Sequence, residues 1–190
     1  MEAAKATLVH YVVDAKASRF TVQAFATGLL SAMGHNPAIG IRNFSGDVNF
    51  DPEALHGSGF RLSIQANSLS VQDDISDKDR REIERMMNEQ VLETAKYPEI
   101  AYDAPVVAIA KLGDSLFSAT LNGNLTLHGV TRSQQVTARI AVFGSMLRAS
   151  GDFTLNQSDY QIKPVSVAGG ALKVKDQLKF SFEMVARQQG

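Results

Sequence analysis

The chain contains no cysteine among its 190 residues. Without cysteine it can form no disulfide, thiolate metal site, iron–sulfur cluster or cysteine nucleophile. It also lacks any apolar run close to the roughly 20 residues that a membrane-spanning helix needs. These absences exclude several mechanisms and an integral membrane helix, but they do not choose a cellular compartment.

Neither sign of charge dominates the sequence. Lysine and arginine total 19, aspartate and glutamate total 20, and the formal net charge is −1. A balanced chain has no basic footprint for nucleic acid or for an anionic membrane surface, so neither is an expected partner. The segment Met1–Leu8 lacks the basic and apolar regions of a secretory signal. We therefore expect a cytoplasmic protein, or a periplasmic one if a signal has been removed.

What the sequence does contain is a repeated alternation of apolar and polar residues. It is clearest over residues 117–127, where phenylalanine, alanine, leucine and glycine alternate with serine, threonine and asparagine. Such a period of two predicts a strand with one dry face and one wet face. Similar or weaker alternation predicts further strands at 8–13, 20–26, 44–50, 60–66, 100–110, 136–142, 147–155 and 178–184.

The predicted strands indicate an all-β fold of one domain, residues 1–190. Parallel sheets need helical crossovers between strands, so the sheet is expected to be antiparallel. Long strands that each carry one continuous apolar face favour closure into a barrel, which leaves no exposed edges. About eight strands enclose an interior that either side chains fill or one small ligand occupies.

One segment departs from this pattern, and it predicts a helix over about 76–95. Ser76 is suited to cap its N-terminus, and Asp77 and Asp79 lie in its first turn. Tyr97-Pro98 then ends it, because a residue before proline avoids the helical region. A narrow apolar stripe follows helical spacing through Ile83, Met86, Met87, Gln90, Val91 and Ala95.

Whether the barrel interior is filled depends on its small inward residues. Scattered among phenylalanine and leucine, they either leave an elongated apolar void or simply pack under the helix and a narrowing end of the barrel. The alternation alone leaves both interpretations open. The residues concerned are Ala24, Ala26, Gly46, Ala66, Ala104, Ala119, Gly123, Ala138, Ala149 and Gly151.

Several short stretches occur together in a fixed order along the chain. They are Tyr11-Val-Val-Asp, Ser18-Arg-Phe, Phe44-Ser-Gly-Asp-Val-Asn-Phe-Asp, Asn67-Ser-Leu, Lys78-Asp-Arg, Tyr97-Pro-Glu-Ile and Leu125-Thr-Leu-His-Gly-Val-Thr. This ordered set resembles the YceI-like family of polyisoprenoid-binding, lipocalin-like proteins over nearly the whole chain. Two stretches depart from the family pattern, a longer helical insert at 82–87 and Gly34-His-Asn-Pro after the second strand.

The resemblance implies a closed eight-stranded, antiparallel, up-and-down barrel of lipocalin-like form with one inserted helix. It also implies that a long apolar lipid, a polyisoprenoid or an isoprenoid quinone, lies inside, with no catalytic constellation and no other cofactor. Family members are often dimeric, so the resemblance allows for a homodimer. Burying each CH₂ group contributes about 0.8 kcal/mol, so an apolar tunnel alone supplies affinity for such a chain.

We expect the ligand to contact inward side chains of the predicted strands. The candidates are Phe20, Val22, Phe44, Val48, Phe60, Leu62, Ile64, Phe117, Leu121, Phe153, Leu155, Phe180 and Phe182. Two polar candidates for a head group join them. His35 lies in the constrained loop 34–37, and Arg80 near the helix start is suited to an anionic group such as a diphosphate.

Other polar residues give little support for catalysis or metal binding. His10, His35, His56 and His128 are scattered without a metal-binding pair, and His128 beside Gly129 fits a turn that bonds to backbone. The acidic residues at 73, 74, 77 and 79 suit a helix N-terminus better than a carboxylate pair. Nucleophile-elbow, Walker and dinucleotide-binding motifs are absent.

Three functions follow in order of preference. The first is non-catalytic binding of an apolar lipid as a carrier, store or buffer. The second is an interaction protein with a filled barrel that docks a partner through its helix, favoured if Met86, Met87 and Val91 form an exposed patch. The third is an enzyme acting on an apolar substrate with His35 as general base, which requires a hydrogen-bonding partner for that histidine.

Overall fold

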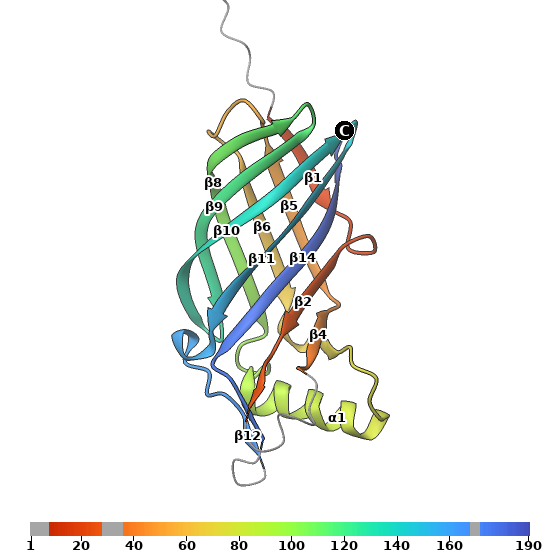
Figure 1. The fold of residues 1–190 in the computed structure, drawn as a ribbon, viewed down its shortest axis with the longest axis vertical. Helices are drawn as coiled ribbons and strands as arrows, with labels where there is room; N and C mark the ends of the chain where they lie inside the picture. The colour runs from red at the N-terminus through yellow and green to blue at the C-terminus, as the bar shows by residue number, and fades with distance from the viewer. Residues whose placement is uncertain (1–7, 28–35, 168–171) are drawn as a thin grey trace, which may run out of the picture.

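The computed structural model describes residues 8–27, 36–167 and 172–190, and it confirms the predicted closed antiparallel barrel (Figure 1). Eight strands follow one another around the ring in chain order, and the last pairs with the first. They are β1 (Val9–Val13), β5 (Phe44–Phe50), β6 (Gly59–Gln65), β8 (Glu99–Gly113), β9 (Leu116–Leu127), β10 (Val130–Phe143), β11 (Met146–Asn156) and β14 (Gln177–Gln188).

The alternating pattern places the apolar residues inside the ring. Along β9, Phe117, Ala119 and Leu121 are buried, as the alternation predicts. The strand β10 begins six residues earlier than expected, because polar residues 131–135 hide the alternation. The two-residue turn His128–Gly129, with φ of 52° and 71°, starts β10 directly after β9. Both left-handed conformations match the twist of a tight hairpin.

Short strands that the alternation did not separate or predict extend the sheet at one end of the barrel. The strands β2 (Arg19–Gln23), β4 (Ala38–Ile41) and β7 (Leu69–Val71) follow β14 in that order. Strand β14 pairs with β1 near its C-terminus and with β2 nearer its N-terminus. A small sheet of β12 (Ser166–Val167), β13 (Leu172–Val174) and β3 (Ala26–Thr27) lies at the same end.

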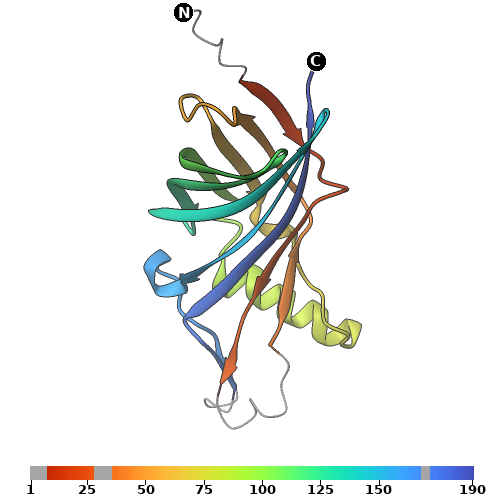
Figure 2. The ribbon, with the colours of Figure 1, turned by 45° about the horizontal axis from the view of Figure 1, so that its top comes forward.

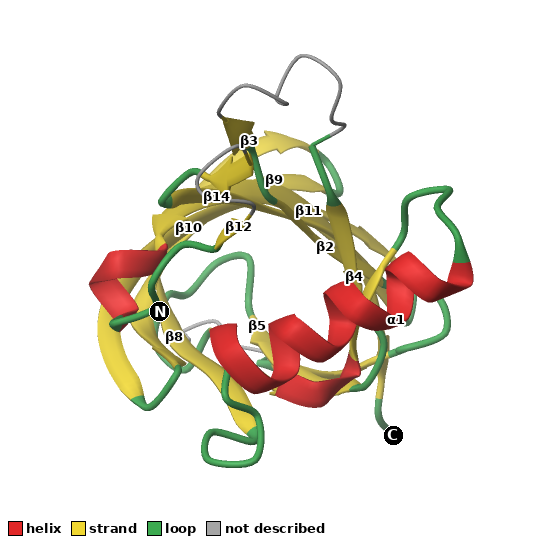
Figure 3. Ribbon diagram, turned by 90° about the horizontal axis from the view of Figure 1, so that it is seen from below, coloured by secondary structure: helices red, strands yellow, loops and turns green. Residues whose placement is uncertain are grey.

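The helix α1 (Asp77–Met86) lies across this end of the barrel, which we call the helix end (Figure 3). It continues as one wider turn, η2 (Met87–Val91). Ser76 caps it as predicted, since its Oγ accepts a hydrogen bond from the Asp79 amide at 3.1 Å. The predicted end at residue 95 is wrong, because Glu93 adopts a left-handed conformation with φ of 47° and stops the helix.

The opposite end of the barrel, the far end, carries the turns that join β8 to β9 and β10 to β11 (Figures 1 and 2). The C-terminus also lies there, because Gln188 of β14 pairs with Tyr11 of β1. The Gln188 amide donates to the carbonyl of Ser145 in the β10–β11 turn at 2.8 Å. These contacts tie the far end together through backbone groups.

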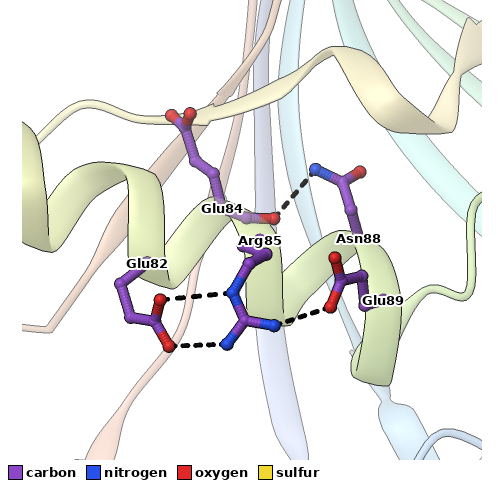
Figure 4. Close-up of polar contacts among 5 residues, drawn as sticks. All are labelled: Glu82, Glu84, Arg85, Asn88 and Glu89. Carbon is purple, nitrogen blue, oxygen red and sulfur yellow. Dashed lines mark hydrogen bonds and ion pairs between the residues drawn. The ribbon is translucent and has the colours of Figure 1, made fainter.

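The outward face of α1 is polar and internally paired. Arg85 lies between Glu82 and Glu89, with nitrogen-to-oxygen distances of 2.7 and 2.6 Å (Figure 4). The Asn88 side chain donates to the Glu84 carbonyl at 2.8 Å. These contacts follow the three- and four-residue spacing of neighbours on a helix surface. The apolar stripe is therefore left to face the barrel.

Polar side chains of α1 also fasten it to the edge strand β7. Strand β7 ends the sheet, so one of its sides has no strand partner within the described ranges. The Glu84 carboxylate accepts from the Val71 amide at 3.0 Å, and the Arg80 guanidinium donates to the carbonyls of Val71 and Asp73, the latter at 3.0 Å. The helix thus satisfies backbone groups that an exposed sheet edge would present to solvent.

Not every small inward residue leaves space. A Cβ added at Gly123 would lie 2.3 Å from the Ala104 Cα, and one at Gly151 would lie 2.5 Å from the Thr137 carbonyl oxygen. These two glycines therefore permit close approach of neighbouring strands. Ala138 and Ala149, in contrast, do line a cavity. The two interpretations of the small residues hold at different positions.

Candidate functional site

The barrel interior contains a large apolar cavity at the helix end, of about 260 Å³. We call it the helix-end cavity. Strands of the barrel wall, the extra strands β2 and β4, and the helix all contribute to it. Its lining residues are Val22, Ala24, Pro37, Ile39, Ile41, Ile64, Leu69, Ile83, Met86, Met87, Val91, Leu92, Ile100, Leu125, Leu127, Phe153, Leu155, Gln157, Ile162, Val165, Val174, Leu178 and Phe180.

A second, smaller cavity of about 70 Å³ lies toward the far end. We call it the inner cavity. Barrel strands and Phe20 of β2 line it, and among the described residues its walls are apolar except for one tyrosine hydroxyl. The lining residues are Phe20, Val48, Phe50, Gly59, Phe60, Leu62, Tyr102, Val106, Leu121, Val136, Ala138, Ile140, Leu147, Ala149, Phe153, Phe180, Phe182 and Met184.

Phe153 and Phe180 line both cavities and form the wall between them. Their rings stack with centroids 4.9 Å apart at an interplanar angle of 29°. Phe20 extends the aromatic cluster, 6.1 Å from Phe180 and 6.2 Å from Phe182. The two cavities are therefore neighbouring parts of one interior, separated by side chains and not by backbone.

Of the thirteen apolar residues predicted to contact a ligand, eleven line one or both cavities. Phe44 and Phe117 line neither. Phe44 packs edge-on against Phe20 with centroids 4.7 Å apart, and Phe117 packs against Phe50 at 5.7 Å. The eleven are Phe20, Val22, Val48, Phe60, Leu62, Ile64, Leu121, Phe153, Leu155, Phe180 and Phe182.

The sequence reasoning did not assign the helix to the cavity. Ile83, Met86 and Val91 line it while remaining half-buried, and Met87 lines it and is buried. Their helical spacing identified them as one stripe, and that signal was read only as a docking face. Because Met86, Met87 and Val91 face the barrel interior, they do not form the exposed patch that would favour docking of a partner.

Two polar side chains line the cavities. The Tyr102 hydroxyl, in the inner cavity, donates to the Gln134 carbonyl at 3.0 Å, and burial raises its pKa to about 12. It therefore stays protonated and keeps this bond across the neutral pH range. Gln157 lines the helix-end cavity, is only 4% exposed, and donates through Nε2 to the Lys175 carbonyl at 3.0 Å.

The histidines do not converge on the cavities in the part of the chain that the structure describes. His128 lies in the β9–β10 turn, with Nδ1 3.2 Å from the Tyr160 carbonyl oxygen and Nε2 2.7 Å from the Glu93 carboxylate. The prediction of a turn histidine bonded to backbone is confirmed. His10 bonds to Asn49, and His56 is exposed. His35 lies outside the described residues, so its predicted role stays a prediction.

The remaining charged candidates serve the helix and its surroundings. Arg80 bonds to two backbone carbonyls and lines neither cavity, so its predicted contact with a head group stays a prediction. Asp73 accepts from the Ala38 amide at 3.0 Å, and Asp79 accepts from the Ser76 hydroxyl at 2.7 Å. Among the described residues, no cluster of three or more histidines and carboxylates could hold a metal ion.

No helix in the described ranges is long and apolar enough to cross a membrane.

The profile of the YceI-like domain matches residues 11–186. The chain belongs to the YceI-like family. The ordered motifs of the sequence and the closed barrel with its helix are thus those of YceI-like proteins, and the predicted resemblance is confirmed.

Curated relatives match over different lengths of the chain. A UPF0312 protein of Shewanella baltica is 26% identical over 134 residues, which cover 70% of this chain and 63% of that protein. A UPF0312 protein of Pseudomonas savastanoi pv. phaseolicola is 27% identical over 195 residues, covering 99% of this chain and 92% of that protein. The match with the Shewanella relatives therefore spans less than two thirds of their length.

Solved structures share the fold at low sequence identity. Burkholderia cenocepacia BcnA has a TM-score of 0.71 at 18% identity, covering 91% of this chain and 98% of BcnA. A polyisoprenoid binding domain from Saccharophagus degradans, implicated in plant cell wall breakdown, has a TM-score of 0.69 at 15% identity. That match covers 96% of this chain and all of the domain. These likenesses establish the fold of this chain and nothing further.

Proposed function

We propose that the protein binds one long apolar lipid, a polyisoprenoid or an isoprenoid quinone, and does not transform it. The helix-end cavity carries this proposal. It encloses about 260 Å³, and all of the described side chains that line it are apolar except Gln157. A carrier, storage or buffering role needs only such a site, because it requires reversible burial of the lipid.

The sizes of the two cavities support entry at the helix end. An apolar cavity of about 150 Å³ is enough to bind benzene, so the helix-end cavity exceeds what a small aromatic ring requires. The inner cavity, at about 70 Å³, falls well below that size. A long chain that fills the helix-end cavity reaches the inner cavity only by displacing Phe153 or Phe180, which separate the two.

The helix supports the same proposal. Ile83, Met86 and Val91 face the cavity without being fully buried, so apolar surface on α1 and η2 is incompletely covered by the protein itself. A lipid in the cavity would bury that surface and gain about 25 cal/mol per Å² of apolar area, less the cost of ordering the chain. The cavity does not favour the alternative of a filled barrel that docks a partner through this stripe.

The fold comparison adds support from one neighbour, whose structure is described as a polyisoprenoid binding domain. Isoprenoid chains are linear runs of five-carbon apolar units that each carry a methyl branch, and they suit an elongated interior lined by phenylalanine and aliphatic residues. A polar or short ligand would leave most of these apolar walls without ligand contacts. The polyisoprenoid class is therefore preferred over a compact apolar ligand.

Native mass spectrometry followed by organic extraction tests the proposal. We expect an isoprenoid-containing molecule at one per chain, or stoichiometric uptake of an added isoprenoid quinone. Met86→Glu places a charge in the cavity wall and should weaken uptake at least tenfold. The control Leu112→Glu changes an exposed leucine on β8 and should bind like the wild type. A wild-type protein that takes up neither quinones nor polyprenols would overturn the proposal.

A further inference from the structure

Gln157 occupies a distinctive position on the cavity wall. It follows Phe153 and Leu155 at alternate positions of the inward face of β11, just where that strand passes into the short helical turn η3 (Gln157–Tyr160). It is only 4% exposed, and it is the single polar side chain among the described residues that line the helix-end cavity. A buried side-chain amide in an apolar wall needs hydrogen-bond partners.

One end of this amide is already engaged. Nε2 donates to the Lys175 carbonyl at 3.0 Å, and the backbone amide of Gln157 donates to the Asp176 carbonyl at 2.9 Å. The Lys175 carbonyl oxygen can only accept a hydrogen bond, so the end of the Gln157 amide that contacts it must be the nitrogen. The Gln157 side chain is thus held against the segment that leads into β14, with its orientation determined.

The other end of the amide is its oxygen, Oε1. No residue in the described part of the chain donates a hydrogen bond to Gln157 Oε1. The Oε1 atom is not one of the fully buried, unpaired atoms of the described residues, so it is accessible to a hydrogen-bond donor of a ligand. The lining residues that the structure describes include no lysine, arginine, aspartate or glutamate. The wall therefore suits a neutral donor better than a charged head group.

We propose that Gln157 is the anchor for the polar end of the bound lipid, accepting a hydrogen bond from a hydroxyl group. This inference rests on the proposed lipid-binding function and deepens it. The ligand class is an isoprenoid chain that ends in a neutral hydroxyl, either a polyprenol or the reduced, quinol form of an isoprenoid quinone. The polar end lies at Gln157, and the chain runs along β11 toward Phe153 and the inner cavity.

Equilibrium binding of matched ligands tests the anchor. The probes are a polyprenol, its methyl ether and its phosphate, all with the same chain, together with an isoprenoid quinol and the matching quinone. We expect the wild type to bind the polyprenol roughly three- to tenfold more tightly than the ether, which has lost the donor. The phosphate should bind more weakly than the polyprenol. The affinities of the polyprenol and the quinol show which of the two hydroxyl groups the site binds more tightly.

Two variants assign the preference to one side chain. Gln157→Met keeps the length of the side chain and removes the acceptor, so polyprenol and ether should bind equally. Gln135→Met makes the same substitution at an exposed position of β10 that lines neither cavity, and it should keep the preference for the polyprenol. Equal binding of polyprenol and ether by the wild type, or a preference that survives in Gln157→Met, would overturn the anchor while leaving lipid binding intact. A wild type that binds no chain at all would instead contradict the proposed function.

Discussion

The two ends of the barrel use the same alternating sequence pattern to different effect. At the far end, inward residues such as Leu147, Ala119 and Ala186 have 0% exposure, and the remaining cavity is about 70 Å³. At the helix end, Val22 and Leu155 stay half-buried around a cavity of about 260 Å³. An inward-facing apolar residue is therefore part of a packed core at one end and of a binding wall at the other.

The difference follows from how the wall is built at each end. At the far end, β14 pairs with β1, and short turns join β8 to β9 and β10 to β11. At the helix end, β14 pairs instead with β2, which leads to β4 and β7, and α1 crosses the opening. Added strands and a separate helix enclose more space than the inward side chains fill.

The largest expected effect is a contrast between two leucines of β11. Leu147→Ala should cost about 3 kcal/mol of unfolding free energy, because this fully buried side chain borders only the small inner cavity and its truncation leaves a new void. Leu155→Ala should cost only about 1 kcal/mol, because that side chain already borders a void. Urea unfolding of the ligand-free variants measures both losses. Equal losses would contradict the contrast between the two ends.

Removing the wall between the cavities should change ligand preference. Phe153→Ala joins the helix-end and inner cavities and should favour longer isoprenoid chains over shorter ones by about tenfold, or ~1.4 kcal/mol. The comparison is the affinity ratio of a long-tailed and a short-tailed quinone. Phe117→Ala, which lines neither cavity, is the control and should leave that ratio unchanged. A Phe153→Ala protein with the wild-type ratio would argue against passage between the cavities.

The stability of the segment after the helix should depend on His128. This side chain bonds to the Glu93 carboxylate beyond η2 and to the Tyr160 carbonyl of η3. His128→Ala removes both bonds and should destabilise the helix end by about 1 kcal/mol. Hydrogen exchange should show faster exchange of amides in 77–97 and unchanged exchange in β9 near residue 119. Uniform acceleration across the barrel would mean that His128 stabilises the whole fold.

The smallest expected effect concerns the turn between β1 and β2. The Asp14 carboxylate accepts a hydrogen bond from Arg187 at 2.9 Å, and this bond, with others from the Ala17 and Lys16 amides, lowers its pKa. A lowered folded pKa stabilises the protein above the unfolded value of about 3.9, and the stabilisation is lost as pH falls through the folded pKa. Asp14→Asn should therefore show a shallower loss of stability below about pH 4. An unchanged pH profile would contradict this.

Much of the barrel could be predicted from the sequence, because alternation reports directly on which face of a strand is buried. The shortest strands could not. Strand β7 has three residues, all buried, and so shows no alternation, and Ala38–Ile41 of β4 is apolar throughout. Their assignment depends on pairing with each other and with β2, which a single segment does not reveal.

The candidate site could be predicted only in part, because residue size does not determine empty space. Gly151 and Ala149 lie two positions apart on β11, yet the first is small to admit the Thr137 carbonyl and the second borders the inner cavity. The helix contribution was missed because the stripe containing Met86 does not reveal which surface it faces. Gln157 was missed because nothing in the sequence distinguishes a buried glutamine from an exposed one.

Photocrosslinking tests the central claim that the helix-end cavity holds the lipid. An isoprenoid quinone with a photoreactive group in its chain is bound, irradiated and mapped by peptide mass spectrometry. We predict crosslinks to residues of the cavity wall on both α1 and β11, in particular Met86 and Leu155, and their loss on competition with unlabelled quinone. Crosslinks confined to exposed apolar residues such as Leu112 and Phe143, unaffected by competitor, would contradict the account.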